Sequence, residues 1–205
     1  MNLSSGAWAA VMALASYAAC AQPYPAKPVR VVVPFAPGGG TDISARQFAQ
    51  KLSETFKQQF VIDNRGGAGG MIGIEMAVKA PPDGYTLMMM SGSYSASSAL
   101  HKPAWDPIKA ILPVCEFGAT PFVLVVHPSV KANNAKELIA LAASKPNALT
   151  YASTGTGGIT HLATELMLHM TKTQMVHVPY KSTGAALTDV LAGQAPVLMG
   201  SLLPV

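Results

Sequence analysis

The stretch "VRVVVPFAPGGGTDISARQFAQ", from Val29 to Gln50, decides the fold. It opens with a run of β-branched residues, which is typical of a buried strand. After the glycines at Gly38, Gly39 and Gly40, apolar residues recur at helical spacing, at Ala45, Phe48, Ala49, Leu52 and Phe56. The pattern predicts a β–loop–α unit in which the glycines lie between a strand end and a helix start near Thr41. Such a junction is a common place for a bound anion.

The residues after this unit continue the alternation of strand and helix. "QQFVIDN" predicts a second strand, "GGMIGIEMAVKA" a short helix, and "PPDGYTLMMMS" a turn followed by a third strand. The order βαβαβ implies parallel pairing with right-handed crossovers.

The pattern breaks into a Pro-containing loop from Lys102 to Pro113 and then begins again. "FVLVVHP" predicts a strand, Ala135 to Ala143 a helix, and "LTYAS", "THLATELMLHM", "QMVHVPY", "GAALTDVLAG" and "PVLMGS" a second βαβαβ order. We therefore predict an α/β protein of two βαβ-type domains with mostly parallel sheets. The predicted limits are 22–105 for the first domain, 106–122 for the crossover and 123–205 for the second domain.

The first 21 residues predict a secretory signal peptide. They contain no charged residue, and their apolar run is too short to span a bilayer. Ala19 and Ala21 form an A-x-A arrangement that predicts cleavage after Ala21 and export. A lipoprotein with an acylated Cys20 is the less favoured alternative, because "YAAC" lacks the usual aliphatic residue three places before the cysteine.

Composition excludes several classes of function. After cleavage Cys115 has no second cysteine to pair with, so we predict no intrachain disulfide and no Cys-x-x-Cys metal set, and we expect Cys115 to pack in the core. The formal charge of +4 comes from scattered Lys and Arg residues. Because a nucleic-acid partner needs a clustered basic stripe, we predict none.

Glycine and hydroxyl residues fill several strand-to-helix junctions. The first, Gly38 to Gly40, is no P-loop, because it lacks the Gly-Lys-Ser/Thr ending and Asp42 would oppose a phosphate. Taken alone, it is equally compatible with a plain turn that has Asp42 near the helix start. The other junctions hold Ser153, Thr154, Gly155, Thr156, Gly157 and Gly158, and then Tyr180, Lys181, Ser182 and Thr183. Such loops can converge on a cleft at the carboxyl ends of the strands, where neutral donors suit a carboxylate.

The sequence favours binding over catalysis. It has no G-x-S-x-G elbow, no H-E-x-x-H pair and no Cys-His signature around Cys115. We expect His161 in the first turn of a helix, His169 on a partly solvated face of that helix, too far away to share a metal, and His177 in a strand. The conceivable acids are Asp63, Asp83 and Glu165, and nothing in the sequence pairs any of them with a base. We therefore predict no catalytic residue, no metal and no cofactor.

Four motifs in order carry a resemblance to a known family. They are "PFAPGGGTD", "DNRGGAGGMIGIEMAVKAPPDGYTL", "LTYASTGTGGITHLATELM" and "HVPYKSTGAALTDVLAGQ". From about Tyr24 to its end, the chain resembles the Bug-type extracytoplasmic receptors of tripartite tricarboxylate transporters. The resemblance implies a two-domain, periplasmic binding protein-like fold. Such a receptor closes on a small organic acid in the periplasm and delivers it to the permease subunits in the membrane.

The same resemblance implies which residues meet the ligand. The implied contacts are Phe35, Gly38, Gly39, Gly40 and Asp42 in the first domain, and Ser153, Thr154, Gly155, Thr156, His161, Tyr180, Lys181 and Asp189 in the second. Ser182 stands where the family commonly has Gly, so the third loop is expected to differ in shape.

Members of the family continue well beyond the position of Val205. The resemblance therefore implies an incomplete second half of the fold, from a fragment or a truncated gene product. Two other functions remain open from the residues alone. They are an exported enzyme acting on small acids and a protein that presents its ligand to a membrane sensor kinase.

Overall fold

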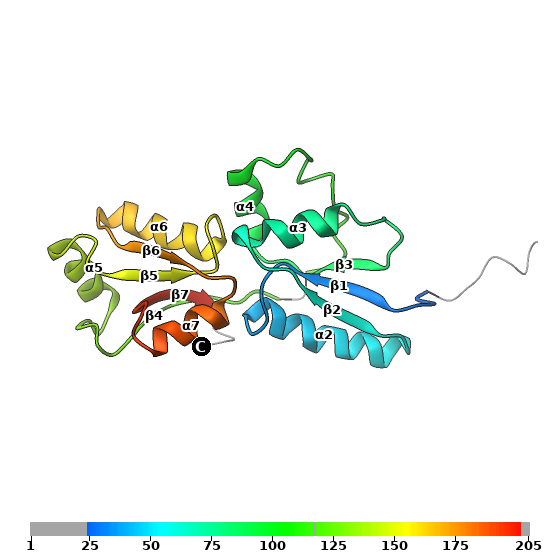
Figure 1. Ribbon diagram of the computed structural model, residues 1–205, viewed down its shortest axis with the longest axis horizontal. Helices are drawn as coiled ribbons and strands as arrows, with labels where there is room; N and C mark the ends of the chain where they lie inside the picture. The colour runs from blue at the N-terminus through cyan, green and yellow to red at the C-terminus, as the bar shows by residue number, and fades with distance from the viewer. Residues whose placement is uncertain (1–23, 117, 202–205) are drawn as a thin grey trace, which may run out of the picture.

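The protein folds into two α/β halves that lie side by side (Figure 1). The computed structural model describes residues 24–116 and 118–201, so the predicted signal peptide lies outside the described residues. Each half has one sheet with helices on both faces. The predicted α/β fold with mostly parallel sheets is confirmed, whereas the predicted domain limits stay a prediction. Among the described residues, no helix is both long and apolar enough to cross a membrane.

The first half is built around a three-stranded parallel sheet in the order β2-β1-β3. In chain order its elements are β1 (Val29–Val33), α2 (Gly40–Phe56), β2 (Phe60–Asn64), the 3-10 turn η1 (Ala68–Gly70), α3 (Met71–Val78), β3 (Thr86–Met88) and α4 (Ser93–His101). The central strand β1 is covered on both faces, which explains its run of valines.

Alternate residues of β1 face the same core, because side chains alternate across a strand. Val29, Val31 and Val33 pack with Ala45 and Ala49 of α2. On the other face, α3 and α4 contribute a second cluster built from Met71, Ile74 and Tyr94. Figure 1 shows α2 on one side of the sheet and α3 and α4 on the other.

The second half has a four-stranded sheet in the order β4-β7-β5-β6. Its elements are β4 (Phe122–Val126), α5 (Ala135–Ser144), β5 (Thr150–Ser153), α6 (Ile159–Thr171), β6 (Val176–Pro179), α7 (Thr183–Leu191) and β7 (Val197–Ser201). β5 pairs in parallel with β6 and β7, and β4 is an antiparallel edge strand on β7.

Successive side chains of the central strands β5 and β7 belong to two separate core clusters. Tyr151 and Val197 belong to the cluster that includes Leu138 of α5 and Leu168 of α6. The next residues along, Ala152 and Leu198, pack with Ala186 and Val190 of α7 on the opposite face.

Two features differ from the sequence-based expectation. Helix α4 was not predicted, because "SYSASSALH" is rich in serine and gives a weak helical pattern. Cys115 is exposed, so the prediction that it packs in the core is wrong. The segment around it forms no helix or strand and lies on the surface, where its neighbours Leu112 and Val114 are also exposed.

Gly73 of α3 tests this packing. An added Cβ would lie 2.7 Å from the Arg65 carbonyl oxygen and 2.7 Å from the Pro34 Cα, both of them backbone atoms. Alanine favours a helix over glycine by about 1 kcal/mol, but overpacking a rigid site costs about 1–3 kcal/mol. We expect Gly73→Ala to lower the free energy of unfolding in a urea titration. The matched control is Ile72→Ala, since the Ile72 side chain is 53% exposed. An unchanged or higher stability of Gly73→Ala would contradict the described contact.

Candidate functional site

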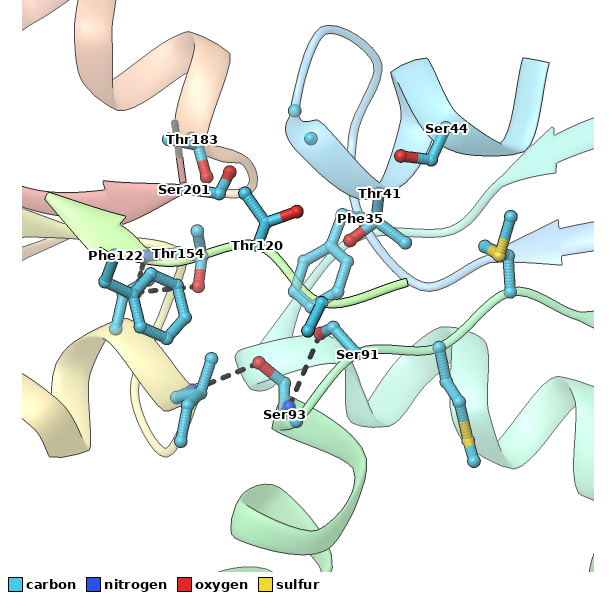
Figure 2. Close-up of a pocket in the computed structure, with 18 of the residues that line it drawn as sticks. Phe35, Thr41, Ser44, Ser91, Ser93, Thr120, Phe122, Thr154, Thr183 and Ser201 are labelled. Carbon is cyan, nitrogen blue, oxygen red and sulfur yellow. Dashed lines mark hydrogen bonds between the residues drawn. The ribbon is translucent and has the colours of Figure 1, made fainter. Parts of the chain in front are cut away.

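A cavity of about 370 Å³ opens between the two halves, at the carboxyl ends of the strands (Figure 2). Nearly half of its lining residues carry a hydroxyl group, and these are Thr41, Ser44, Ser91, Ser93, Thr120, Thr154, Thr160, Thr183 and Ser201. Its apolar lining residues are Phe35, Met89, Met90, Ala119, Phe122 and Ile159, and its glycines are Gly39, Gly40, Gly92 and Gly118. Among the described lining residues, Glu116 alone carries a formal charge.

The helices α2, α4, α6 and α7 all begin at this cavity. The first N–H groups of a helix have no partner within the helix, and the helix dipole makes that end positive. Gly39 and Gly158 are the N-caps of α2 and α6, and they offer no side chain to cover those groups. The described part of the cavity lining therefore presents neutral hydrogen-bond donors and partial positive charge, and no Lys or Arg side chain.

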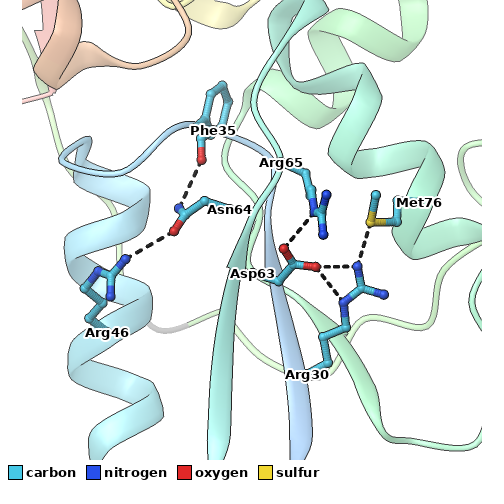
Figure 3. Close-up of polar contacts among 7 residues, drawn as sticks. All are labelled: Arg30, Phe35, Arg46, Asp63, Asn64, Arg65 and Met76. Atoms are coloured by element: carbon cyan, nitrogen blue, oxygen red, sulfur yellow. Dashed lines mark hydrogen bonds and ion pairs between the residues drawn. The ribbon is translucent and has the colours of Figure 1, made fainter.

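Asp42 supports the start of α2 by hydrogen bonds, although it does not line the cavity. Its carboxylate is 2% exposed and accepts hydrogen bonds from the Gly38 N–H at 3.0 Å, Arg46 Nε at 3.0 Å and Asn64 Nδ2 at 2.9 Å. Asn64 also donates to the Phe35 carbonyl at 3.0 Å, as Figure 3 shows. Asp42 thus joins the strand end to the helix start and does not line the cavity.

Burial and hydrogen bonding act in opposite directions on the pKa of Asp42. Burial raises it, but the hydrogen bonds from Arg46, Gly38 and Asn64 together outweigh burial and leave the pKa below its usual 3.8. The carboxylate is therefore ionised at neutral pH and is neutralised locally by Arg46.

Helix α4, which the sequence did not predict, brings Ser93 to the cavity, and Ser91 lies just before the helix. The Ser93 hydroxyl accepts from the Ile159 N–H at 3.0 Å, so a first-half residue caps a second-half helix. Ser97 Oγ lies 2.8 Å from the Gly69 carbonyl oxygen and 3.0 Å from that of Gly157. Helix α4 therefore fastens the two halves together beside the cavity. A signal was available, because "SGSYS" follows a strand parallel to β1 and must emerge at the same edge.

Thr154 is the member of the second junction that lines the cavity. Its backbone N–H donates to Thr160 Oγ1 at 2.9 Å, and its own Oγ1 lies 2.9 Å from the same atom. These bonds tie the end of β5 to the first turn of α6.

The third junction contributes Thr183 to the cavity lining. The predicted contact residues Tyr180, Lys181 and Asp189 do not line the cavity. The Tyr180 hydroxyl donates to Asp189 at 2.6 Å, and burial together with this bond raises the Tyr180 pKa to about 12. The Lys181 carbonyl accepts from the Ala36 N–H at 3.0 Å, which joins the halves a second time. Ser182 caps α7 by accepting from the Ala185 N–H at 3.2 Å.

The predicted contact residues thus fall into two groups. Phe35, Gly39, Gly40 and Thr154 line the cavity. The remaining ones lie outside the lining and support it or pack elsewhere, namely Gly38, Asp42, Ser153, Gly155, Thr156, His161, Tyr180, Lys181 and Asp189. Contact of any of them with a ligand stays a prediction.

The acids considered from the sequence also lie away from the cavity lining. Asp63 forms ion pairs with Arg30 and Arg65 (Figure 3), and although burial raises its pKa, these hydrogen bonds lower it overall. Asp83 pairs with Lys27 at 3.7 Å, and Glu165 accepts a hydrogen bond from Tyr151.

The side chains give little support for catalysis. Ser153 Oγ lies 2.6 Å from His177 Nε2, but Ser153 is 0% exposed and neither residue lines the cavity. Over residues 24–116 and 118–201, no three His, Cys, Asp or Glu side chains are grouped as metal ligands.

Two α/β halves with a polar cavity between them form the arrangement expected of a binding protein that holds a small ligand at a domain interface. Residues 44–205 match the tripartite tricarboxylate transporter family receptor, so the chain belongs to this family of receptors, which are not enzymes. It is similar to the protein BugT of Bordetella pertussis, with 38% identity over 84% of this chain and 54% of BugT.

Solved structures agree with this assignment. A protein of R. palustris with adipate is 34% identical, with a TM-score of 0.84 over 89% of this chain and 62% of that one. MatC from Rhodopseudomonas palustris with bound malate is 30% identical, with a TM-score of 0.83 over 88% of this chain and 62% of that one. The chain thus spans about half the length of BugT, 54%, and 62% of each of these solved chains.

The network around Asp42 leads to a prediction. In Asp42→Asn, an amide NH₂ would face donors that now share the two carboxylate oxygens, so we expect a loss of about 1–3 kcal/mol in the free energy of unfolding. Because the folded pKa lies below 3.8, the carboxylate's contribution is present above that pH and is lost as the pH falls through the folded value. The difference between the two proteins should therefore shrink in strongly acidic denaturant titrations. Glu54→Gln, at an exposed position, is the control, and an Asp42→Asn effect no larger than its effect would refute this role.

Proposed function

We propose that the protein is an extracytoplasmic receptor that binds a small organic acid at the cavity between its halves. The observation that carries the proposal is the convergence of α2, α4, α6 and α7 starts on a cavity with neutral donors. Support also comes from the family and from the relatives solved with adipate and malate.

A carboxylate suits this cavity better than a larger polyanion. Helix N-termini and hydroxyls stabilise one negative charge through several hydrogen bonds, each worth about 1.5–3 kcal/mol when the partner is charged. A phosphate with two charges would find no Lys or Arg among the described lining residues. Phe35 and Phe122 offer apolar surface for the carbon skeleton of an acid.

The charge of Glu116 gives the ligand an orientation. Glu116 belongs to the crossover side of the lining and repels anionic groups that approach it. We place the bound carboxylate beside Gly39, Gly40 and Thr183, at the starts of α2 and α7.

The remaining parts of the proposal concern the whole protein. We infer that it is exported with cleavage after Ala21, acts in the periplasm, and delivers its acid to the membrane permease subunits of a tripartite transporter. The proposed domains keep the limits 22–105 and 123–205, joined by the crossover 106–122.

The binding proposal is tested by thermal unfolding with matched ligand pairs. Adipate and malate are compared with their neutral diamides, which keep the skeleton and remove the charge. An acid at a hundred times its Kd stabilises the folded state by about 2.7 kcal/mol, which raises Tm by roughly 5–10 °C for a chain of this size. We expect a saturable rise with at least one small carboxylate, with succinate, glutamate and benzoate extending the series. No rise with any acid, or equal rises with acid and diamide, would refute carboxylate binding.

Two variants of Gly39 that match in shape and differ in charge test whether this loop holds the ligand. Gly39 has φ −89° and ψ 165°, and an added Cβ would lie 3.6 Å from its nearest neighbours, so a side chain fits without strain. Asp and Asn are both good N-caps, so both variants should fold at least as well as the parent. We expect Gly39→Asp to weaken acid binding by more than tenfold, because a fixed carboxylate occupies the anion's place. Gly39→Asn should lose much less. Equal calorimetric affinities for the two variants would remove this loop from the site.

A further inference from the structure

Two histidine rings stack against each other next to the second-half loop that borders the cavity. His161, in the first turn of α6, and His177, on β6, have ring centroids 4.1 Å apart. Tyr151 of β5 stacks on His177 at 5.0 Å, and its hydroxyl donates to Glu165. Neither histidine lines the cavity, so their role in binding must be indirect.

Each ring is connected to one backbone N–H of this loop. The Gly157 N–H donates to His161 Nδ1 at 3.2 Å. The Gly155 N–H donates to Ser153 Oγ at 3.1 Å, and this hydroxyl lies 2.6 Å from His177 Nε2. Since Ser153 Oγ accepts from Gly155, its own proton is available for the ring nitrogen. The His161 contact therefore requires an unprotonated Nδ1, whereas Ser153 and His177 can bond with either atom as the donor, because a hydroxyl can accept two hydrogen bonds.

The loop held in this way, residues 155–158, shapes the cavity and joins the halves. Gly155 and Gly157 have φ of +114° and +81°, in the left-handed region that favours glycine. The Gly157 carbonyl lies 3.0 Å from Ser97 Oγ in the other half. The lining residues Thr154 and Ile159 flank the loop on either side. A change in its shape would therefore move donors on the cavity wall.

We propose that His161 and His177 are positioning residues for the ligand cavity. The neutral His161 ring and the Ser153–His177 pair hold the loop 155–158 in its binding shape, and protonation of His161 releases the Gly157 N–H and weakens ligand binding. The effect on affinity rests on the proposed function, whereas the effect on loop order does not.

The chemistry of a protonated ring supports this assignment. With a proton on Nδ1, His161 would point a donor at the Gly157 N–H, and that hydrogen bond would be lost. The groups that face the rings are Glu165 on α6 and Tyr151 on β5, with His101 of α4 close to Gly157. Glu165 attracts a proton to the rings, and each histidine repels a second proton on the other.

Burial has the largest effect on the pKa of each of the two rings. It lowers the pKa of His161 below 6.5, against the opposing pull of Glu165. Burial and the neighbouring His161 lower the pKa of His177 to about 4. A buried neutral histidine contributes stability fully above its unfolded pKa, and this contribution is lost as the pH falls through the folded pKa. Both rings are therefore neutral at pH 7, and the loop should loosen as His161 becomes protonated below pH 6.5.

The experiment uses replacements that separate hydrogen bonding from titration. Asparagine places its Oδ1 near the position of Nδ1 and does not titrate, so His161→Asn should keep the bond to Gly157 at every pH. His161→Phe keeps a stacking ring without an acceptor. His169→Asn, at an exposed position on the same helix, is the matched control.

Affinity for the acid that raises Tm most is measured by calorimetry from pH 7.5 to 4.5. We expect His161→Phe to bind roughly two- to tenfold more weakly at pH 7 and His161→Asn to bind like the parent. Below pH 6.5 the parent and His169→Asn should lose affinity more steeply than His161→Asn. Ligand protonation is common to all the variants and cancels in this comparison. Parallel pH profiles for the parent and His161→Asn, or parent-like binding by His161→Phe, would overturn the proposal.

Hydrogen exchange at the Gly155 and Gly157 amides of the free protein provides a readout without ligand. We expect protection at pH 7 that falls on acidification in the parent and persists in His161→Asn at Gly157. Unprotected amides at pH 7, or protection independent of pH in the parent, would refute the positioning role. If no acid binds the parent, the proposed function fails, and exchange alone still decides whether the histidines order the loop.

Discussion

The structure depends on how the N–H groups at the helix starts are satisfied. In parallel βα units, strand ends and helix starts meet at one edge of the sheet, and each helix leaves its first N–H groups without internal partners. Here some of these groups are satisfied across the two halves, as where Ser93 accepts from the Ile159 N–H. Others face the cavity, where Gly39 provides no capping side chain. The same constraint therefore joins the halves and leaves donors for an anion.

Charged and titratable groups form a supporting layer behind this neutral wall. Asp42 holds the first loop through Gly38, Arg46 and Asn64, and His161 holds the second through Gly157. Burying an ionised group is tolerated where hydrogen bonds compensate for it, as they do at Asp42. This arrangement fixes the shape of the cavity, and among the lining residues that the structure describes Glu116 alone is charged.

The sequence predicted much of the fold because its signals are local. Valine runs, turn glycines and helical spacing marked β1, α2 and the second βαβαβ order. Helix α4 was missed because serine-rich segments have weak helical patterns, and its capping of Ile159 depends on contact between the halves. The stacked histidines could not be foreseen either, because parallel pairing of β5 with β6 sets His177 opposite Tyr151, and only the fold brings His161 beside them. Gly39 and Gly40 of the first predicted loop line the cavity, but the sequence does not show which of their neighbours face it.

The most direct test of the central claim is an amide-resolved NMR titration with a small carboxylate that binds. If helix starts hold the anion, the largest shifts on saturation should fall on the amides of Gly40, Thr41 and Thr183, with smaller shifts along α3 and α5. The largest shifts at amides remote from the cavity, such as those of the outer strand β2 around Val61, would contradict the account.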